Sequence, residues 1–264
     1  MRLAAVSTSS HEIPGVPCWV SLLARDLESA QRFYSAVLGW DFRPTHLGKG
    51  VLVAFQGGAP VAGLGALTAA VRMPAVWTPY FAVEDADATS ARIRERGATM
   101  AVGPLAFGSG RAALAADPAG AVFGFWHGEA VPDWSMGRGN APAWLELRTR
   151  DAFAAAIFYG EVLDWDSERP GSCTVSYEHD HVVLRHGHGT VARISGGALE
   201  AAPDPEVRPR WHVHFHVPDL EGTVEAATGL GGRAASPVHT STTSRWIVLA
   251  DPEGALFTVV TPQR

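Results

Sequence analysis

Lysine and cysteine are scarce in this sequence. Of its 21 basic residues only Lys49 is a lysine, so few side chains are available for Schiff-base chemistry. The two cysteines, Cys18 and Cys173, are too few for a disulfide framework or a four-cysteine zinc site. We therefore expect reduced thiols in a cytoplasmic protein.

Long apolar runs and basic blocks are also missing. A helix that spans a bilayer needs about 20 consecutive apolar residues, and no stretch comes close. The start of the chain lacks a basic segment followed by an apolar one, so we expect no secretory signal. With a net charge of −6, the chain is also a poor candidate for nucleic-acid binding. The 264 residues, 47% of them hydrophobic, are enough for two globular domains.

The two halves of the chain are copies of each other. Residues 17–26 recur without a gap at 142–151, and the same offset of 125 relates Phe33-Tyr34 to Phe158-Tyr159. Farther along, an offset of 134 relates the motif Asp-Pro-x-Gly-x-x-Phe at 117–123 to its copy at 251–257. We place the resulting nine-residue insertion near Tyr177–Gly189. The duplication predicts a first domain over 1–129, a linker over 130–141 and a second domain over 142–264.

Each half divides again into two similar units. A β-like run leads to an aspartate and then to a helical pattern at Asp26, Asp85, Asp151 and Asp219. Aspartate in this place is a typical helix N-cap. Short β-like runs separated by glycine and proline come after each helix. The sequence thus predicts an α+β protein that repeats the unit strand–helix–strand–strand–strand four times.

These motifs resemble those of the vicinal oxygen chelate superfamily, which includes glyoxalase I, bleomycin-resistance proteins and extradiol dioxygenases. The resemblance is carried by strand–Asp–helix–Phe-Tyr–Leu-Gly-Trp and by Asp-Pro-x-Gly-x-x-Phe, and it covers nearly the whole chain. The segments 17–20 and 144–147 are similar to an actinobacterial branch of tandem proteins called hydroxylase or growth-inhibition-type. The resemblance implies two tandem glyoxalase-like domains, each with two βαβββ modules in a cup-shaped mixed sheet. Which modules pair, and whether the protein is a monomer or a homodimer, stay open.

Members of this superfamily that bind a divalent metal draw ligands from the first and last strands of each module. The resemblance places these positions at Trp19, Thr78 and Gly124 in one half, and at Trp144, His212 and Thr258 in the other. Indole, glycine and a neutral hydroxyl are poor ligands for a divalent ion. We therefore expect no bound cofactor. The alternative is a non-standard divalent metal site made by His212, His214 and Glu146.

Without a metal, Trp19 and Trp144 would present flat indole surfaces to a planar aromatic ligand. The alternative is that each tryptophan fills a vestigial cavity. The candidate ligand-binding residues combine aromatic, hydroxyl and imidazole groups: Trp19, Ser21, Tyr80, Trp126, Trp144, His216 and Thr258.

The second half also carries groups suited to proton transfer. His212, His214 and His216 alternate along a predicted strand and so share one face. If the protein is an enzyme, His214 or His212 acts as the base, Glu146 orients it or acts as an alternative acid, and Arg148 binds an anion. Alternatively, the Glu–Arg and Glu–His pairs are only structural.

These patterns favour three functions. The first is binding of a small hydrophobic or aromatic molecule, in specialised metabolism or drug self-protection, without a metal. The second is an enzyme, a lyase, isomerase or cofactor-independent oxygenase, that uses the histidine-rich cup. The third is a scaffold with filled cavities. None of the three involves nucleic acid or a membrane.

Overall fold

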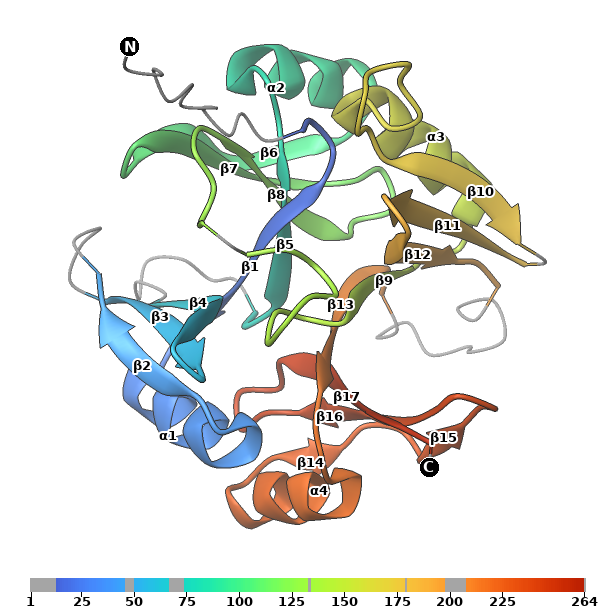
Figure 1. Ribbon diagram of the computed structural model, residues 1–264. Coiled ribbons are helices and arrows are strands. Elements are labelled where there is room, and N and C mark those ends of the chain that lie inside the picture. Colours follow the sequence, from blue (N-terminus) through green and yellow to red (C-terminus); the bar gives the residue numbers. More distant parts are fainter. Residues whose placement is uncertain are drawn as a thin grey trace, which may run out of the picture.

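The computed structural model describes residues 13–45, 50–66, 74–132, 134–178, 180–197 and 208–263. The first half contains β1 (Pro17–Ala24), α1 (Leu27–Leu38), β2 (Asp41–Pro44), β3 (Val51–Gln56), β4 (Ala59–Ala66), β5 (Trp77–Ala82), α2 (Ala86–Glu95), β6 (Thr99–Phe107), β7 (Gly110–Ala116) and β8 (Val122–His127). The second half contains β9 (Trp144–Arg148), α3 (Ala152–Leu163), β10 (Thr174–Glu178), β11 (His181–His186), β12 (Gly189–Ser195), β13 (Arg210–His216), α4 (Leu220–Gly229), β14 (Arg233–Ala234), β15 (His239–Thr240), β16 (Ser244–Ala250) and β17 (Leu256–Pro262). The predicted unit recurs four times, and its last copy carries the additional short strand β15 (Figure 1).

Each half forms one mixed sheet, so the modules pair within a half. The first sheet has the strand order β2-β3-β4-β1-β5-β8-β7-β6, and the second has β10-β11-β12-β9-β13-β17-β16-β14. In both sheets the two modules join through one antiparallel pair, β1 with β5 and β9 with β13. The predicted α+β fold, with two tandem domains of two modules each, is confirmed.

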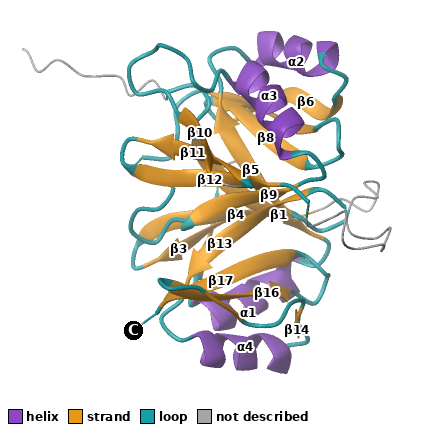
Figure 2. Ribbon diagram, turned by 90° about the vertical axis from the view of Figure 1, so that its right-hand side faces the viewer, coloured by secondary structure: helices purple, strands orange, loops and turns teal. Residues whose placement is uncertain are grey.

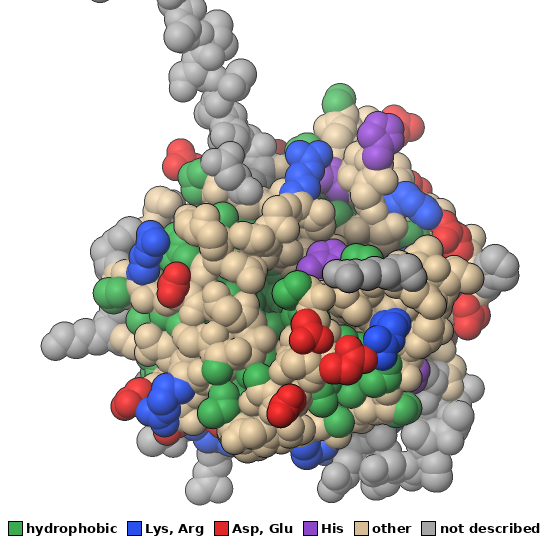
Figure 3. Space-filling model, turned by 60° about the horizontal axis from the view of Figure 1, so that its bottom comes forward, with side chains coloured by type: hydrophobic (Ala, Val, Ile, Leu, Met, Phe, Trp, Pro, Cys, Tyr) green, Lys and Arg blue, Asp and Glu red, His purple; other side chains and the backbone are tan. Residues whose placement is uncertain are grey.

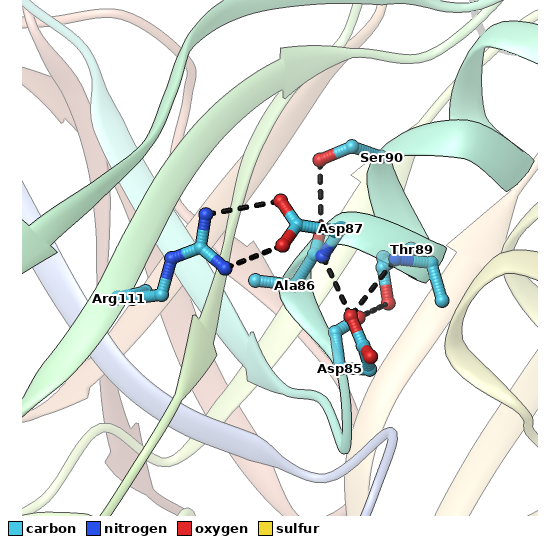
Figure 4. Close-up of polar contacts among 7 residues, drawn as sticks. Asp85, Ala86, Asp87, Thr89, Ser90 and Arg111 are labelled. Carbon is cyan, nitrogen blue, oxygen red and sulfur yellow. Dashed lines mark hydrogen bonds and ion pairs between the residues drawn. The ribbon is translucent and has the colours of Figure 1, made fainter.

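All four helices begin at the predicted aspartate caps. The side chains of Asp26, Asp85, Asp151 and Asp219 each accept a hydrogen bond from backbone N–H in the first turn. Figure 4 shows this cap on α2, where Arg111 of β7 also forms two hydrogen bonds with Asp87. In α4 a Cβ atom on residue 222 would lie 2.4 Å from Asp219 Oδ2. Glycine at that position leaves room for the capping carboxylate.

The helices gather at the two ends of the molecule, with the strands between them (Figure 2). Helix α1 of the first domain packs against α4 of the second, and α2 packs against α3. Aromatic side chains from both sheets meet in the core between the domains. Examples are Trp77 with Phe215 at 5.2 Å and Phe81 with Trp211 at 5.5 Å between ring centroids. One apolar core therefore joins the two domains.

A Trp–Tyr–Asp hydrogen-bond chain crosses this core twice. Trp77 Nε1 donates to Tyr34 Oη at 3.0 Å, and Tyr34 Oη donates to Asp251 Oδ2 at 3.0 Å. The equivalent chain runs from Trp211 through Tyr159 to Asp117, at 2.9 and 3.0 Å. In each of these hydrogen-bond chains the tyrosine and the aspartate belong to different domains.

The duplicated motifs thus meet across the interface, because the tyrosine of each copy needs the Asp-Pro turn of the other. Trp40 and Trp165 stack on these tyrosines with ring centroids 5.8 and 5.6 Å apart. Both tryptophans are buried.

The position predicted for the insertion is wrong. Ala54 and Leu184 occupy equivalent places in the two sheets and are already 130 residues apart, so five of the nine inserted residues precede β11. The other four lie between β12 and β13, because Thr78 and His212 differ by 134. The error arose because no motif shared by the two halves was found between Trp165 and Trp211, so the position of the insertion within this stretch was not fixed.

On the face in Figure 3 acidic and basic side chains are interspersed among apolar and neutral ones. Within the part of the chain that the structure describes, no helix is long and apolar enough to cross a membrane.

Candidate functional site

The candidate residues lie on the face of each sheet that points away from the core between the domains. Side chains alternate along a strand, so Trp211, Val213 and Phe215 point toward the first domain while His212, His214 and His216 point the other way. We define the second-domain face as the side chains of Trp144, Glu146, Arg148, Arg193, Ser195, His212, His214 and Thr258. The first-domain face consists of their register equivalents Trp19, Ser21, Leu23, Gly63, Gly65, Thr78, Tyr80 and Gly124.

Strand register brings the second-domain face together. Glu146 on β9 lies opposite His212 on β13 and Arg193 on β12. One step along, Trp144 lies opposite His214, and His214 lies opposite Thr258 on β17. The predicted residues on this face therefore come from three neighbouring strands, β9, β13 and β17, and β12 adds Arg193.

His214 is at the centre of this face. Its imidazole stacks on the indole of Trp144, with ring centroids 4.6 Å apart and planes inclined by 22°. Its Nε2 faces Glu146 Oε2 at 3.4 Å. Neither ring nitrogen of His214 has a partner with full hydrogen-bond geometry among the described residues. Because the side chain is only 4% exposed, Nδ1 is buried without a protein partner, and Nε2 has only the carboxylate of Glu146 beside it.

Glu146 carries a charge on this face. Burial raises the pKa of this carboxyl, but His214 and Arg148 outweigh burial and lower the pKa to about 2. Arg148 Nε lies 3.5 Å from Glu146 Oε1, and Ser195 Oγ donates a hydrogen bond to the same oxygen at 3.2 Å. Glu146 is therefore a carboxylate at neutral pH.

The histidines of β13 are neutral at the same pH. Burial lowers the pKa of His212 to about 3, against the opposing effect of Glu146. Burial also lowers the pKa of His214 and of the exposed His216. A neutral imidazole offers one donor and one acceptor. His214 can therefore both donate to and accept from a bound molecule.

The first-domain face has different chemistry at the same register. Ser21 and Thr78 stand where the second domain has Glu146 and His212, and Tyr80 stands where it has His214. The Tyr80 ring lies over Gly124, where an added Cβ would be 2.4 Å from the ring. Ser21 Oγ and Tyr80 Oη are 3.4 Å apart. This face holds no charged side chain.

The segment between the domains covers part of the first-domain face. Trp134 is buried, its ring centroid lies 5.6 Å from that of Trp19, and its Nε1 donates to the backbone oxygen of Val61 at 2.9 Å. Val61 lies where β3 and β4 shift register, and such a bulge leaves a residue outside the regular ladder. The segment continues to Ala143, whose backbone N–H donates to the backbone oxygen of His214 at 2.7 Å. In Figure 1 it crosses the middle of the view, from β5 toward β13.

The predicted residues therefore fall into two separate groups. Glu146, His212, His214, Trp144 and Thr258 gather on the second-domain face, with Arg148 at their side and His216 farther along β13. Trp19, Ser21, Tyr80 and Trp126 lie on the other sheet. Trp126 is half-buried at the end of β8, and its Nε1 donates to the backbone oxygen of Glu129.

Sequence reasoning missed Arg193, Ser195 and Trp134. Arg193 and Ser195 lie on β12, which pairs in parallel with β9, and the alternation of the segment 189–195 could have placed both on one face. The parallel pairing itself has no local signal in the sequence. No sequence pattern distinguished Trp134 from its neighbours in the segment interpreted as a linker.

The residues present do not fit the metal site of the related fold. Of the positions that the resemblance assigns to ligands, only His212 carries a side chain that binds divalent ions well. Within the described ranges, no three His, Cys, Asp or Glu side chains come together as a metal site, and this includes His212, His214 and Glu146. Burial raises the pKa of the Cys173 thiol to about 12.

Comparison with known proteins agrees with the fold and the duplication. A family model described as a glyoxalase-like domain matches residues 19–125 and again 144–260. The chain belongs to the glyoxalase-like domain family. A relative named "Putative glyoxylase CFP32", from Mycobacterium tuberculosis, is 32% identical over 94% of this chain and 95% of its own. The anthracycline biosynthesis protein DnrV of Streptomyces peucetius is also 32% identical, over 94% of this chain and 93% of its own.

Solved structures with this fold are more distant in sequence. The Mn(II)-bound glyoxalase from Novosphingobium aromaticivorans matches with a TM-score of 0.58 at 16% identity, over 94% of this chain and 82% of that one. A homoprotocatechuate 2,3-dioxygenase variant from B. fuscum matches with a TM-score of 0.60 at 14% identity, over 94% of this chain and 72% of that one. At such identities the similarity concerns the fold of this glyoxalase-like protein.

Proposed function

We propose that this glyoxalase-like protein binds a small planar aromatic molecule on its second-domain face, without a metal ion. The observation that carries the proposal is the state of His214. Buried polar atoms nearly always have a hydrogen-bond partner, yet neither ring nitrogen of His214 has one with full hydrogen-bond geometry among the residues that the structure describes. Nε2 faces the carboxylate of Glu146 at 3.4 Å, and a bound molecule that reaches Nδ1 would supply the partner that the protein does not.

The aromatic class of the ligand is inferred from Trp144. The indole is half-buried and already stacks on His214, and the guanidinium carbon of Arg193 lies 5.8 Å from its ring centroid. Stacking on an aromatic ring contributes about 0.5–1.5 kcal/mol beyond burial of area. Two relatives named as anthracycline biosynthesis proteins support a role in specialised metabolism.

Fluorescence titration of the purified protein with a planar aromatic probe such as 2-naphthamide tests this proposal. We expect saturable binding that EDTA leaves unchanged and that Trp144→Ala weakens by about tenfold or more. The register equivalent Trp19→Ala is the control, and it should leave affinity within about twofold, since Trp19 packs against Trp134. Loss of binding with EDTA, or equal loss in both variants, would contradict the proposal. Native mass spectrometry of the untreated protein then looks for a molecule that copurifies.

Catalysis is a second candidate, favoured by Glu146 beside a buried neutral imidazole. Histidine in that state can accept a proton from a bound substrate, while Glu146 stabilises the imidazolium that forms. Turnover of the bound compound would support catalysis if His214→Gln abolishes it and Glu146→Gln reduces it, with binding retained in both variants. Recovery of the compound unchanged after prolonged incubation would support binding alone.

A further inference from the structure

The two domains differ most in the charge on their outward faces. Arg148 and Arg193 stand where the first domain has Leu23 and Gly63, and Glu146 is the only acidic side chain on the second-domain face. Glu146 is already engaged by Arg148 at 3.5 Å and by the hydroxyl of Ser195. Among the described residues, no carboxylate lies within ion-pair distance of Arg193. One positive charge on this face is therefore not neutralised.

Arg148 lies directly opposite Arg210 on the neighbouring strand β13, so a further guanidinium lies beside this face. Arg210 is half-buried, and burial lowers its pKa. A group of guanidinium side chains around one carboxylate is more typical of anion recognition than of stability.

From this charge arrangement we infer that the molecule bound on the second-domain face is an anion, an aromatic carboxylate or phenolate. The inference rests on the proposed function. The ring of the ligand stacks against Trp144 and its anionic group lies toward Arg193, whose guanidinium is exposed and close to that indole. Guanidinium suits such a group because its planar fork of N–H donors matches the two oxygens of a carboxylate.

A matched pair of probes separates this inference from the proposed function. 2-Naphthoate and 2-naphthamide share ring, size and shape, and differ in charge at the group that would meet Arg193. We expect the wild type to bind 2-naphthoate about tenfold more tightly than 2-naphthamide at low salt, with the difference shrinking at about 0.5 M NaCl. Arg193→Gln should remove most of the preference for 2-naphthoate over 2-naphthamide.

Arg43→Gln is the control variant. Arg43 of the first domain also lies over an aromatic ring, 4.2 Å from the Phe55 centroid, and its replacement should change neither affinity. Equal affinity of the wild type for both probes would overturn the inference and leave the proposed function standing. A preference for 2-naphthoate that survives in Arg193→Gln would overturn it in the same way. If neither probe binds, both proposals fail.

Discussion

The outward faces of the two domains have opposite chemistry on the same backbone. Strands β4, β1, β5 and β8 pair in the same order and register as β12, β9, β13 and β17. On the first face Tyr80 lies over Gly124 and Trp134 packs on Trp19, so aromatic side chains of the chain itself occupy it. On the second face a carboxylate, guanidinium groups and buried histidines lie together. The two copies share a backbone, but of these two faces only the second carries charged and imidazole side chains.

The inward faces, which meet in the core between the domains, have the same chemistry in both domains. Each tyrosine of the Trp–Tyr–Asp chains donates to the aspartate of the other domain at 3.0 Å, and each stacks on its own tryptophan in the same way. Burial raises the pKa of both tyrosines and of both aspartates. The interface is symmetric because the Trp, Tyr and Asp of one hydrogen-bond chain each have a counterpart in the other.

The largest expected effect is a loss of stability when Trp134, which covers part of the first-domain face, is truncated. Trp134→Ala should lower the free energy of unfolding by about 3–5 kcal/mol, the usual cost of truncating a buried tryptophan. Urea denaturation measures this loss. Trp126→Ala, at a half-buried position of the same domain, should cost clearly less. Equal losses in the two variants would mean that Trp134 does not occupy the first-domain face.

The symmetry of the interface predicts two matched effects. Tyr34→Phe and Tyr159→Phe each leave a buried aspartate oxygen and an indole N–H without their partner, so each should cost about 1–3 kcal/mol. The two losses, from the same denaturation experiment, should agree within about 0.5 kcal/mol. A loss confined to one variant would show that the two halves of the interface are not equivalent.

The second-domain face should make stability depend on pH. The pKa of His212 is about 3 in the folded protein, below its unfolded value, so the stability it contributes is present above about pH 6.5 and is lost as pH falls. Between about pH 7 and pH 5 this loss is about 2 kcal/mol for one such histidine, and His214 adds to it in the same direction.

The variant His212→Gln should therefore show a shallower fall in unfolding free energy than the wild type over that pH range. Glu95→Gln, on the exposed side of α2, is the control and should behave as the wild type does. A slope unchanged in His212→Gln would show that this imidazole is not held neutral by burial.

The smallest expected change in stability comes from a substitution on the first-domain face, which is uncharged. Ser21 Oγ and Tyr80 Oη are 3.4 Å apart, a long hydrogen bond, so Ser21→Ala should change stability by only about 0.5 kcal/mol or less. Thermal denaturation gives the comparison. A loss above about 1 kcal/mol would indicate a polar network on the first-domain face as important as that on the second.

Much of the fold could be predicted from the sequence because its signals are local. An aspartate before an apolar helical pattern marks an N-cap wherever the chain goes next, and all four caps formed. Alternation along β13 placed His212, His214 and His216 on one face for the same reason. The sequence therefore predicted the polar residues of two strands of the candidate site, but it did not predict which of these residues are in contact.

What the sequence alone determined is the duplication, the four modules and the set of side chains on each strand. Only the tertiary structure decided that modules pair within a half, that the hydroxyls of Tyr34 and Tyr159 meet the aspartates of the opposite domain, and that Trp134 packs on Trp19. It also decided that Nδ1 of His214 lacks a hydrogen-bond partner among the described residues. The physical reason is that these contacts join residues far apart in the chain. Parallel pairing, interface packing and the burial of a polar atom depend on which segments meet, and no local pattern records that.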